Sequence, residues 1–230
     1  MTQQAQPACF VIRAATRSDA QALTTLHCAA FQPGEHIPVL LGRDYVLATY
    51  RWLTNTNEGY CLVADCGDKL IGFIGIYDSS YVRPMFFACL PAMIGSILRR
   101  PGLLLEARLW RRLLRRPDVA IAGKRVGDRS GFAQVTAVAV DAEHRHGGVF
   151  LALVDAAYAY SKNRGSRAIR SGVYKTNEPS RWAFKKAGWI ETPELETKDT
   201  VFCVRTIDRE FLSDLTPFQT AHTGNAKKHT

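Results

Sequence analysis

The architecture of this chain follows from one segment, Val138-Ala-Val-Asp-Ala-Glu-His-Arg-His-Gly-Gly-Val-Phe-Leu-Ala-Leu-Val154. A β-rich run passes through a short polar loop into an apolar helix, with two glycines at the turn. The first N–H groups of a helix have no partner inside it and lie at the positive end of its dipole. Glycine lets an anion approach them closely, so the segment predicts a pyrophosphate site, although two glycines there are also an ordinary turn.

Strand and helix patterns alternate on both sides of this segment, which predicts a mixed α/β architecture. Cys66-Gly-Asp-Lys69 joins two β-rich runs and predicts a hairpin of antiparallel strands, whereas the prolines of residues 31–38 predict a loop. We expect strands at 10–14, 60–65, 70–77, 132–140, 168–174 and 200–207, and helices at 18–30, 44–54, 147–163 and 178–187.

Length and composition indicate a globular protein, because 47% of its 230 residues are hydrophobic and 22% are charged. We expect a single domain at 1–212 and a disordered tail at 213–230. The beginning of the chain shows no export signal, and Pro91 interrupts the longest uncharged run, Pro84 to Leu98. We therefore expect no membrane span and a cytoplasmic location. The six cysteines form no C-x-x-C pair, which disfavours zinc and disulfides.

Most of the net charge of +9 lies in one segment, since residues 99–129 hold ten basic and three acidic side chains. Such a patch favours an anionic partner. We expect residues 82–129 to form a helical insertion between the third and fourth strands, two helices followed by a basic loop. On its second helix, five arginines share one arc: Arg108, Arg111, Arg112, Arg115 and Arg116.

The opposite arc of that helix, Leu109, Trp110, Leu113 and Leu114, has two interpretations. It dips into an anionic membrane while the arginines contact lipid phosphates, which would make the protein peripheral to the membrane. Alternatively, it packs on the protein's own sheet or on a second subunit of a homodimer. A nucleic-acid partner is disfavoured, because only Trp110 is an aromatic neighbour of the patch and no nucleic-acid motif is present.

Two motifs narrow the interpretation. Arg145-His-Gly-Gly-Val-Phe150 matches the pattern R/Q-x-x-G-x-G/A except at its last position. Asn177-Glu-Pro-Ser-Arg-Trp-Ala-Phe-Lys-Lys-Ala-Gly-Trp189 matches N-x-x-A/S-x-x-x-Y/F-x-x-x-G-F/W. Together they resemble the GNAT superfamily of acyl-CoA-dependent N-acyltransferases from Phe10 to about Ile207, without the Arg-rich insertion. The resemblance implies a central, mostly antiparallel sheet that is splayed at the cofactor site and carries helices on both faces.

This resemblance implies an acyltransferase, most simply an N-acetyltransferase that moves an acetyl group from acetyl-CoA directly to a small-molecule or lipid-linked amine. The alternative is a catalytically weak or inactive GNAT-fold protein that acts as a peripheral membrane or interaction module. No metal is expected. The resemblance assigns cofactor contacts to one strand and both motifs, at Val138, Val140, Arg145, His146, Gly147, Gly148, Val149, Phe150, Asn177 and Phe184.

Two phenylalanines depart from the family pattern. Phe150 replaces a small residue, so its ring must find space beside the cofactor or in the helix packing. Phe184 stands where many members have a tyrosine that protonates the departing thiolate, and phenylalanine has no proton to transfer. Tyr174 is then the nearest tyrosine in the sequence that offers this proton.

A general base is not evident on the central strand, where Gln134 and Thr136 stand in the region that holds a glutamate in some members. Glu35 and His36 lie in the early loop, which borders the acceptor site in this family, and either is a candidate base. The alternative is a solvated loop. His27 lies on the apolar side of the first helix, where a hydrogen-bonded core histidine is expected.

Overall fold

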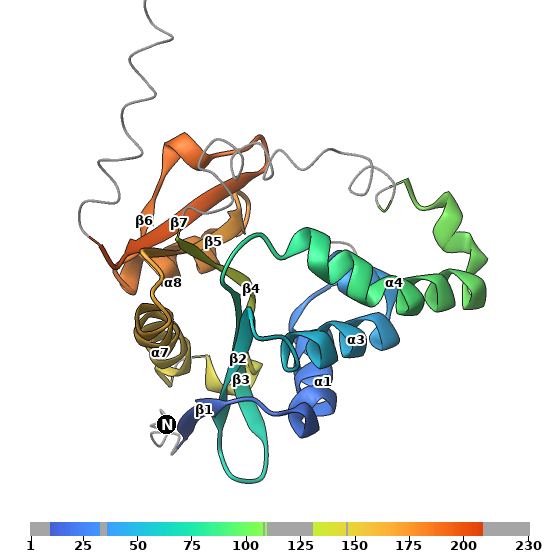
Figure 1. The fold of residues 1–230 in the computed structure, drawn as a ribbon, viewed down its shortest axis with the longest axis horizontal. Helices are drawn as coiled ribbons and strands as arrows, with labels where there is room; N and C mark the ends of the chain where they lie inside the picture. Colours follow the sequence, from blue (N-terminus) through green and yellow to red (C-terminus); the bar gives the residue numbers. More distant parts are fainter. Residues whose placement is uncertain (1–9, 33–35, 108, 110–130, 146, 209–230) are drawn as a thin grey trace, which may run out of the picture.

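The computed structural model describes residues 10–32, 36–107, 109, 131–145 and 147–208 (Figure 1). In this part of the chain a sheet of seven strands runs in the order β1-β2-β3-β4-β5-β7-β6. Every neighbouring pair is antiparallel except β4 and β5, so the expected mixed, mostly antiparallel sheet is confirmed. The strands are β1 Val11–Ala14, β2 Gly59–Asp65, β3 Leu70–Tyr77, β4 Phe132–Val140, β5 Ala168–Tyr174, β6 Ile190–Glu191 and β7 Thr200–Thr206.

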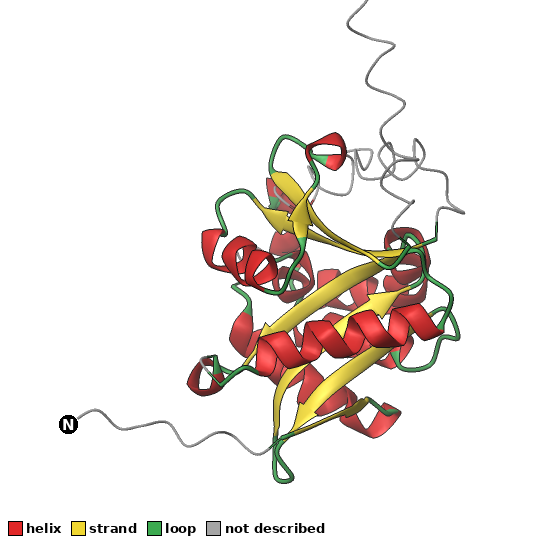
Figure 2. Ribbon diagram, turned by 90° about the vertical axis from the view of Figure 1, so that its left-hand side faces the viewer, coloured by secondary structure: helices red, strands yellow, loops and turns green. Residues whose placement is uncertain are grey.

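Helices cover both faces of the sheet (Figure 1). On one side lie α1 Ala20–Ala30, the short α2 Ile37–Leu41 and α3 Arg43–Leu53. On the other lie α7 Val149–Asn163 and α8 Glu178–Lys186, and Figure 2 shows α7 crossing the strands. The residues of β3 alternate between two apolar clusters, with Ile74 packed in that of α7 and Phe73 in that of α1 and α3. A strand buried on both faces is continuously apolar, as β3 is.

The β2–β3 hairpin forms where it was expected, with Cys66 N–H donating to the Lys69 carbonyl at 3.0 Å. The loop predicted at residues 31–38 is shorter than expected, because Ile37 and Pro38 begin α2. Proline is tolerated in the first turn of a helix, where its missing N–H would have no partner in any case. The two-residue strand β6 was also not predicted, since it is too short to show alternation.

The insertion between β3 and β4 is helical over its described part, in α4 Val82–Arg99 and the 3₁₀ segment η2 Pro101–Leu105. Its α4 lies outside α3, farther from the sheet (Figure 1). Cys89 and Met93 of α4 pack against Leu41 and Tyr45 in a separate apolar cluster.

Leu109 is fully buried in that same cluster, so its predicted place in a membrane is wrong. Leu109 packs within the protein, but against α2, α3 and α4 and not on the sheet that the alternative named. Trp110, Leu113, Leu114 and the five arginines of the predicted amphipathic helix lie outside the described residues, as does the tail at 213–230. Among the described helices, α4 is long and apolar enough to cross a membrane by length and composition, with a mean hydropathy of 1.3 over Val82–Arg99.

Candidate functional site

The two central strands separate part of the way along their length. β4 and β5 pair in parallel only at Phe132↔Ala168, Ala133↔Ile169 and Gln134↔Arg170. β4 continues to Val140 with β3 on one side, and in the described structure no strand pairs with its other edge there. Val138 and Val140 lie on this open stretch. Their strand therefore has backbone groups available for a ligand that inserts between β4 and β5.

A bulge at Thr136 marks the start of the open stretch. Gly75 pairs with Ala137 and Ile76 with Val135, which leaves Thr136 outside the register. A Cβ on Gly75 would lie 2.4 Å from Thr136 Oγ1, so a larger residue opposite the bulge would have to displace the Thr136 side chain. The bulge changes which residues of β4 face the α1–α3 side: Ala137 and Ala139 pack there, whereas Val138 and Val140 pack toward α7.

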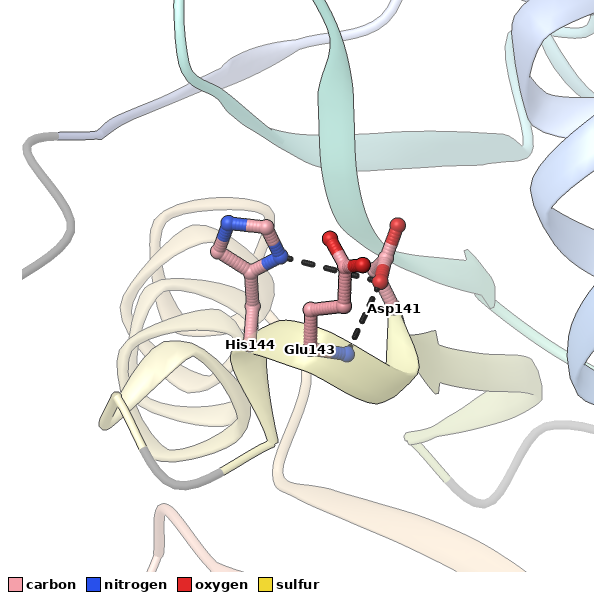
Figure 3. Close-up of side chains that lie close together, drawn as sticks. All are labelled: Asp141, Glu143 and His144. Atoms are coloured by element: carbon pink, nitrogen blue, oxygen red, sulfur yellow. Dashed lines mark hydrogen bonds and ion pairs between the residues drawn. The ribbon is translucent and has the colours of Figure 1, made fainter. Parts of the chain in front are cut away.

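The turn after β4 is held by carboxylates. Asp141 caps the 3₁₀ turn Ala142–His144 by accepting the Glu143 N–H at 3.0 Å, and this hydrogen bond is the largest cause of the lowered pKa of Asp141. Figure 3 shows Glu143 and His144 beside it, and the three side chains offer ligand atoms within 4.8 Å of one another. Lys69 Nζ lies 3.6 Å from both carboxylates and offsets their charge. This cluster lies in the turn that leads from β4 toward Gly147 and Gly148.

The N-terminus of α7 carries the predicted phosphate loop. Gly148 is its N-cap at φ +76°, a left-handed conformation that favours glycine, and nothing lies within 4 Å of the position of a Cβ. Arg145, Gly147 and Gly148 are exposed, Val149 is buried, and His146 lies outside the described residues. The N–H groups that begin α7 have no acceptor within the helix, and they point from the end of the molecule at which β4 and β5 have separated.

The two phenylalanines that differ from the family pattern contact each other. The rings of Phe150 and Phe184 meet edge to face, with centroids 5.2 Å apart, and Phe184 also lies 4.8 Å from Trp189. Phe184 is 1% exposed and Phe150 is half-buried. The ring of Phe150 is thus accommodated by the helix packing, one of the two places expected for it.

The second motif begins α8. The Asn177 side chain accepts the Ser180 N–H at 3.1 Å and caps the helix, which is the role that its position predicts. Tyr174, the candidate proton donor, is the last residue of β5 and pairs with Thr200 of β7. It lies on the strand that separates from β4, four residues beyond Arg170, which is the last β5 residue paired with β4, and it is half-buried.

His36, one of the two candidate bases, is half-buried and ends a chain of hydrogen bonds that extends into the core. His36 Nδ1 lies 3.1 Å from His27 Nε2, and His27 Nδ1 lies 2.6 Å from the Tyr50 hydroxyl. His27 is 3% exposed, and burial, with a smaller effect of His36, lowers its pKa from 6.5 to about 3. His27 is therefore the hydrogen-bonded core histidine that was expected, but its bond to His36 was not predicted. Glu35 lies outside the described residues.

Glu58, a carboxylate that the sequence analysis did not single out, lies near the point where β4 and β5 separate. The Tyr77 hydroxyl donates to Glu58, and Tyr77 pairs directly with Gln134, which accepts a hydrogen bond from buried Arg170 at 3.3 Å. Burial, with the Glu58 bond, raises the pKa of Tyr77 to about 12. Glu58 precedes β2 in an ordinary turn, and nothing in its neighbours signals this contact.

One family of known proteins matches part of the chain. Residues 107–189 match the sequence model of the acetyltransferase (GNAT) family. This range includes β4, the glycine turn, α7, β5 and α8. No curated protein sequence matches the chain.

Solved structures share the fold. The GNAT domain of S. lividans PAT is 16% identical, with a TM-score of 0.56 over 86% of this chain and 90% of that one. NAA60 of Arabidopsis thaliana, solved in complex with acetyl-CoA, is 14% identical, with a TM-score of 0.54 over 86% and 99%. The putative acetyltransferase yncA of Salmonella typhimurium, solved with its cofactor acetyl-CoA, is 14% identical, with a TM-score of 0.53 over 87% and 95%.

Proposed function

We propose that the chain is an acyl-CoA-dependent acyltransferase of the GNAT superfamily, most simply one that moves an acetyl group from acetyl-CoA directly to an amine. One observation carries this proposal: the open edge of β4 and the N-terminus of α7 lie at the same end of the central strands. The first offers hydrogen bonds to an extended chain and the second offers N–H groups to a pyrophosphate. The acetyl-CoA complexes of NAA60 and yncA, which share the fold, support this choice of co-substrate.

The chain's own groups fit acyl-CoA along its length. Gly148 has open space where a side chain would block a phosphate, and Arg145 adds a fixed positive charge. The open edge of β4 from Val135 to Val140 faces the gap toward β5. Acyl-CoA supplies an activated thioester carbonyl there. With acyl-CoA bound, a backbone N–H of β4 near Val138 would donate to the carbonyl oxygen and stabilise the negative charge that develops on it.

The transfer forms an N–C bond to the acyl carbon, breaks its bond to sulfur, and requires removal of one proton from the amine. We assign this proton to His36. For His36 Nε2 to accept it, His36 Nδ1–H must donate to His27 Nε2, and His27 Nδ1–H to the Tyr50 oxygen. The low pKa of His27 keeps that ring neutral, so it remains an acceptor. Phe184 has no proton for the thiolate, and Tyr174, on the separated β5, stays our candidate donor.

Calorimetry with acetyl-CoA tests the proposal on one glycine and a matched control. Gly148→Glu places a carboxylate at the proposed pyrophosphate position and should abolish binding through charge repulsion. Gly165→Glu is the control, because Gly165 follows the other end of α7, has φ +82°, and also has nothing within 4 Å of its Cβ position. Both variants carry the same backbone strain. Retained binding in Gly148→Glu, or equal loss in both variants, would show that the site is misplaced.

A further inference from the structure

Exposed apolar side chains gather on the insertion. Among the described residues, eleven large apolar side chains are exposed, and six of them lie between residues 82 and 105. Five of the six form what we call the α4 face: Phe87, Ile94 and Leu98 of α4, and Leu104 and Leu105 of the following segment η2. Leu98 is 76% exposed and Leu105 is 88% exposed. A soluble protein leaves single apolar residues in water, but a group of them on one segment of the chain marks an interaction surface.

The helix α4 is apolar on two opposite sides. Cys89, Met93 and Ser96 are buried toward α3, at the i, i+4, i+7 spacing of one stripe. Phe87, Ile94 and Leu98 follow at i, i+7 and i+11, which places them together on the side that faces away from that packing. The α4 face is therefore not the packing surface of the helix. Its apolar side chains have no role in the described core.

Positive charge surrounds this face. No charged residue occurs from Pro84 to Leu98, and Arg83, Arg99 and Arg100 stand at the two ends of the run, all exposed. Arg83 lies over the Phe87 ring, with its Cζ 6.0 Å from the centroid. A groove of about 600 Å³ between α3 and α4 adds Arg51 beside Arg99, against a single carboxylate, Asp44, which pairs with Arg99. Apolar side chains framed by arginines match the interface of an anionic membrane.

We propose that the α4 face lies on the surface of an anionic lipid bilayer, with α4 parallel to the membrane plane. The helix does not cross the bilayer, because Cys89 and Met93 hold it against α3 through a buried cluster. A second copy of this chain fits the face less well, since a two-fold contact would bring the same arginines of both copies together. The face lies on the α3 side of the sheet, whereas α7 lies on the other, so binding would leave the phosphate loop in water (Figure 1).

Vesicle flotation tests this proposal without reference to acyl transfer. The full-length protein should float with vesicles of phosphatidylcholine and phosphatidylserine at low salt, and much less with phosphatidylcholine alone or at high salt. Leu98→Ser and Leu105→Ser should each weaken binding about tenfold, because each removes one leucine from the apolar interface. Arg83→Gln should weaken it about fivefold and reduce its dependence on salt.

Ile190→Ser is the matched control, because Ile190 is 61% exposed on β6, away from the insertion. It should float as well as the parent. All four positions are exposed, so thermal melting should show that each variant folds. The proposal is overturned if the parent does not float with anionic vesicles at low salt, or if Ile190→Ser loses as much binding as Leu98→Ser. A dimer in sedimentation that Leu98→Ser dissociates, without flotation, would instead assign the face to a second copy.

Discussion

At the scale of single residues, His27 shows how burial selects a protonation state. The ring lies against Phe31, Phe73 and Tyr50, and both of its nitrogens have hydrogen-bond partners. A positive charge there would lose its hydration, and the neighbouring His36 adds a further unfavourable interaction. The same burial that keeps His27 neutral at physiological pH fixes the position of His36 beside it.

This burial makes stability depend on pH. In the unfolded chain His27 takes up a proton near pH 6.5, whereas in the fold it resists until about pH 3. The contribution of the neutral His27 ring to folding stability is therefore complete above pH 6.5. As the pH falls below this value, the free energy of unfolding decreases by up to about 1.4 kcal/mol per pH unit. Urea unfolding between about pH 6.5 and 4.5 should show this dependence of the unfolding free energy on pH in the parent. In His27→Gln the slope should be smaller, because one proton fewer is taken up on unfolding. Equal slopes in both proteins would contradict a neutral His27.

At the scale of elements, the approach of α7 to the sheet depends on one glycine of β3. A Cβ on Gly72 would lie 2.9 Å from side-chain atoms of both Val149 and Leu153. Val149 is the first residue of α7 and follows Gly148. The packing of the helix on β3 thus sets the position of the phosphate loop, and a change inside the core is transmitted to the proposed ligand site.

Gly72→Ala tests this link. We expect it to destabilise the protein by about 1–3 kcal/mol, through overpacking, and to weaken acetyl-CoA binding by displacing the start of α7. Gly95→Ala is the control, since Gly95 lies within α4, has open space at its Cβ position, and should gain about 0.5–1 kcal/mol in helix stability. Chemical unfolding and calorimetry on both variants measure these effects. Normal stability and binding in Gly72→Ala would mean that α7 adjusts at no cost.

Elements could be predicted from the sequence where their structure depends on residues that are close together in the chain. The hairpin at Cys66 and the cap at Asn177 follow from turn and capping chemistry, and both are present. The separation of β4 from β5 and the bulge at Thr136 could not be derived from residue patterns, because they depend on how strands distant in sequence pair. For the same reason the contacts of His27 with His36 and of Glu58 with Tyr77 were missed. The splayed sheet was expected only through the family resemblance.

At the scale of the whole molecule, the sheet separates two regions with different chemistry. The α7 side and the open edge of β4 present backbone donors, whereas α4, outside α3 on the other side, presents apolar side chains and arginines (Figure 1). The two surfaces share no described residue. A ligand of one region should therefore leave the other unchanged, unless the sheet transmits a rearrangement between them.

Hydrogen exchange on the whole protein measures this separation. An unpaired strand edge and the first turn of a helix exchange readily, because their N–H groups have no protein acceptor. Saturating acetyl-CoA should slow exchange in residues 135–140 and 147–151, where we place its pantetheine arm and pyrophosphate, and should leave residues 87–105 unchanged. It should also raise the melting temperature, since a ligand at about 100 times its Kd stabilises the folded state by about 2.7 kcal/mol. Protection confined to residues 87–105, or spread evenly over the sheet, would contradict the proposed site, because a ligand held between β4 and β5 orders those two segments first.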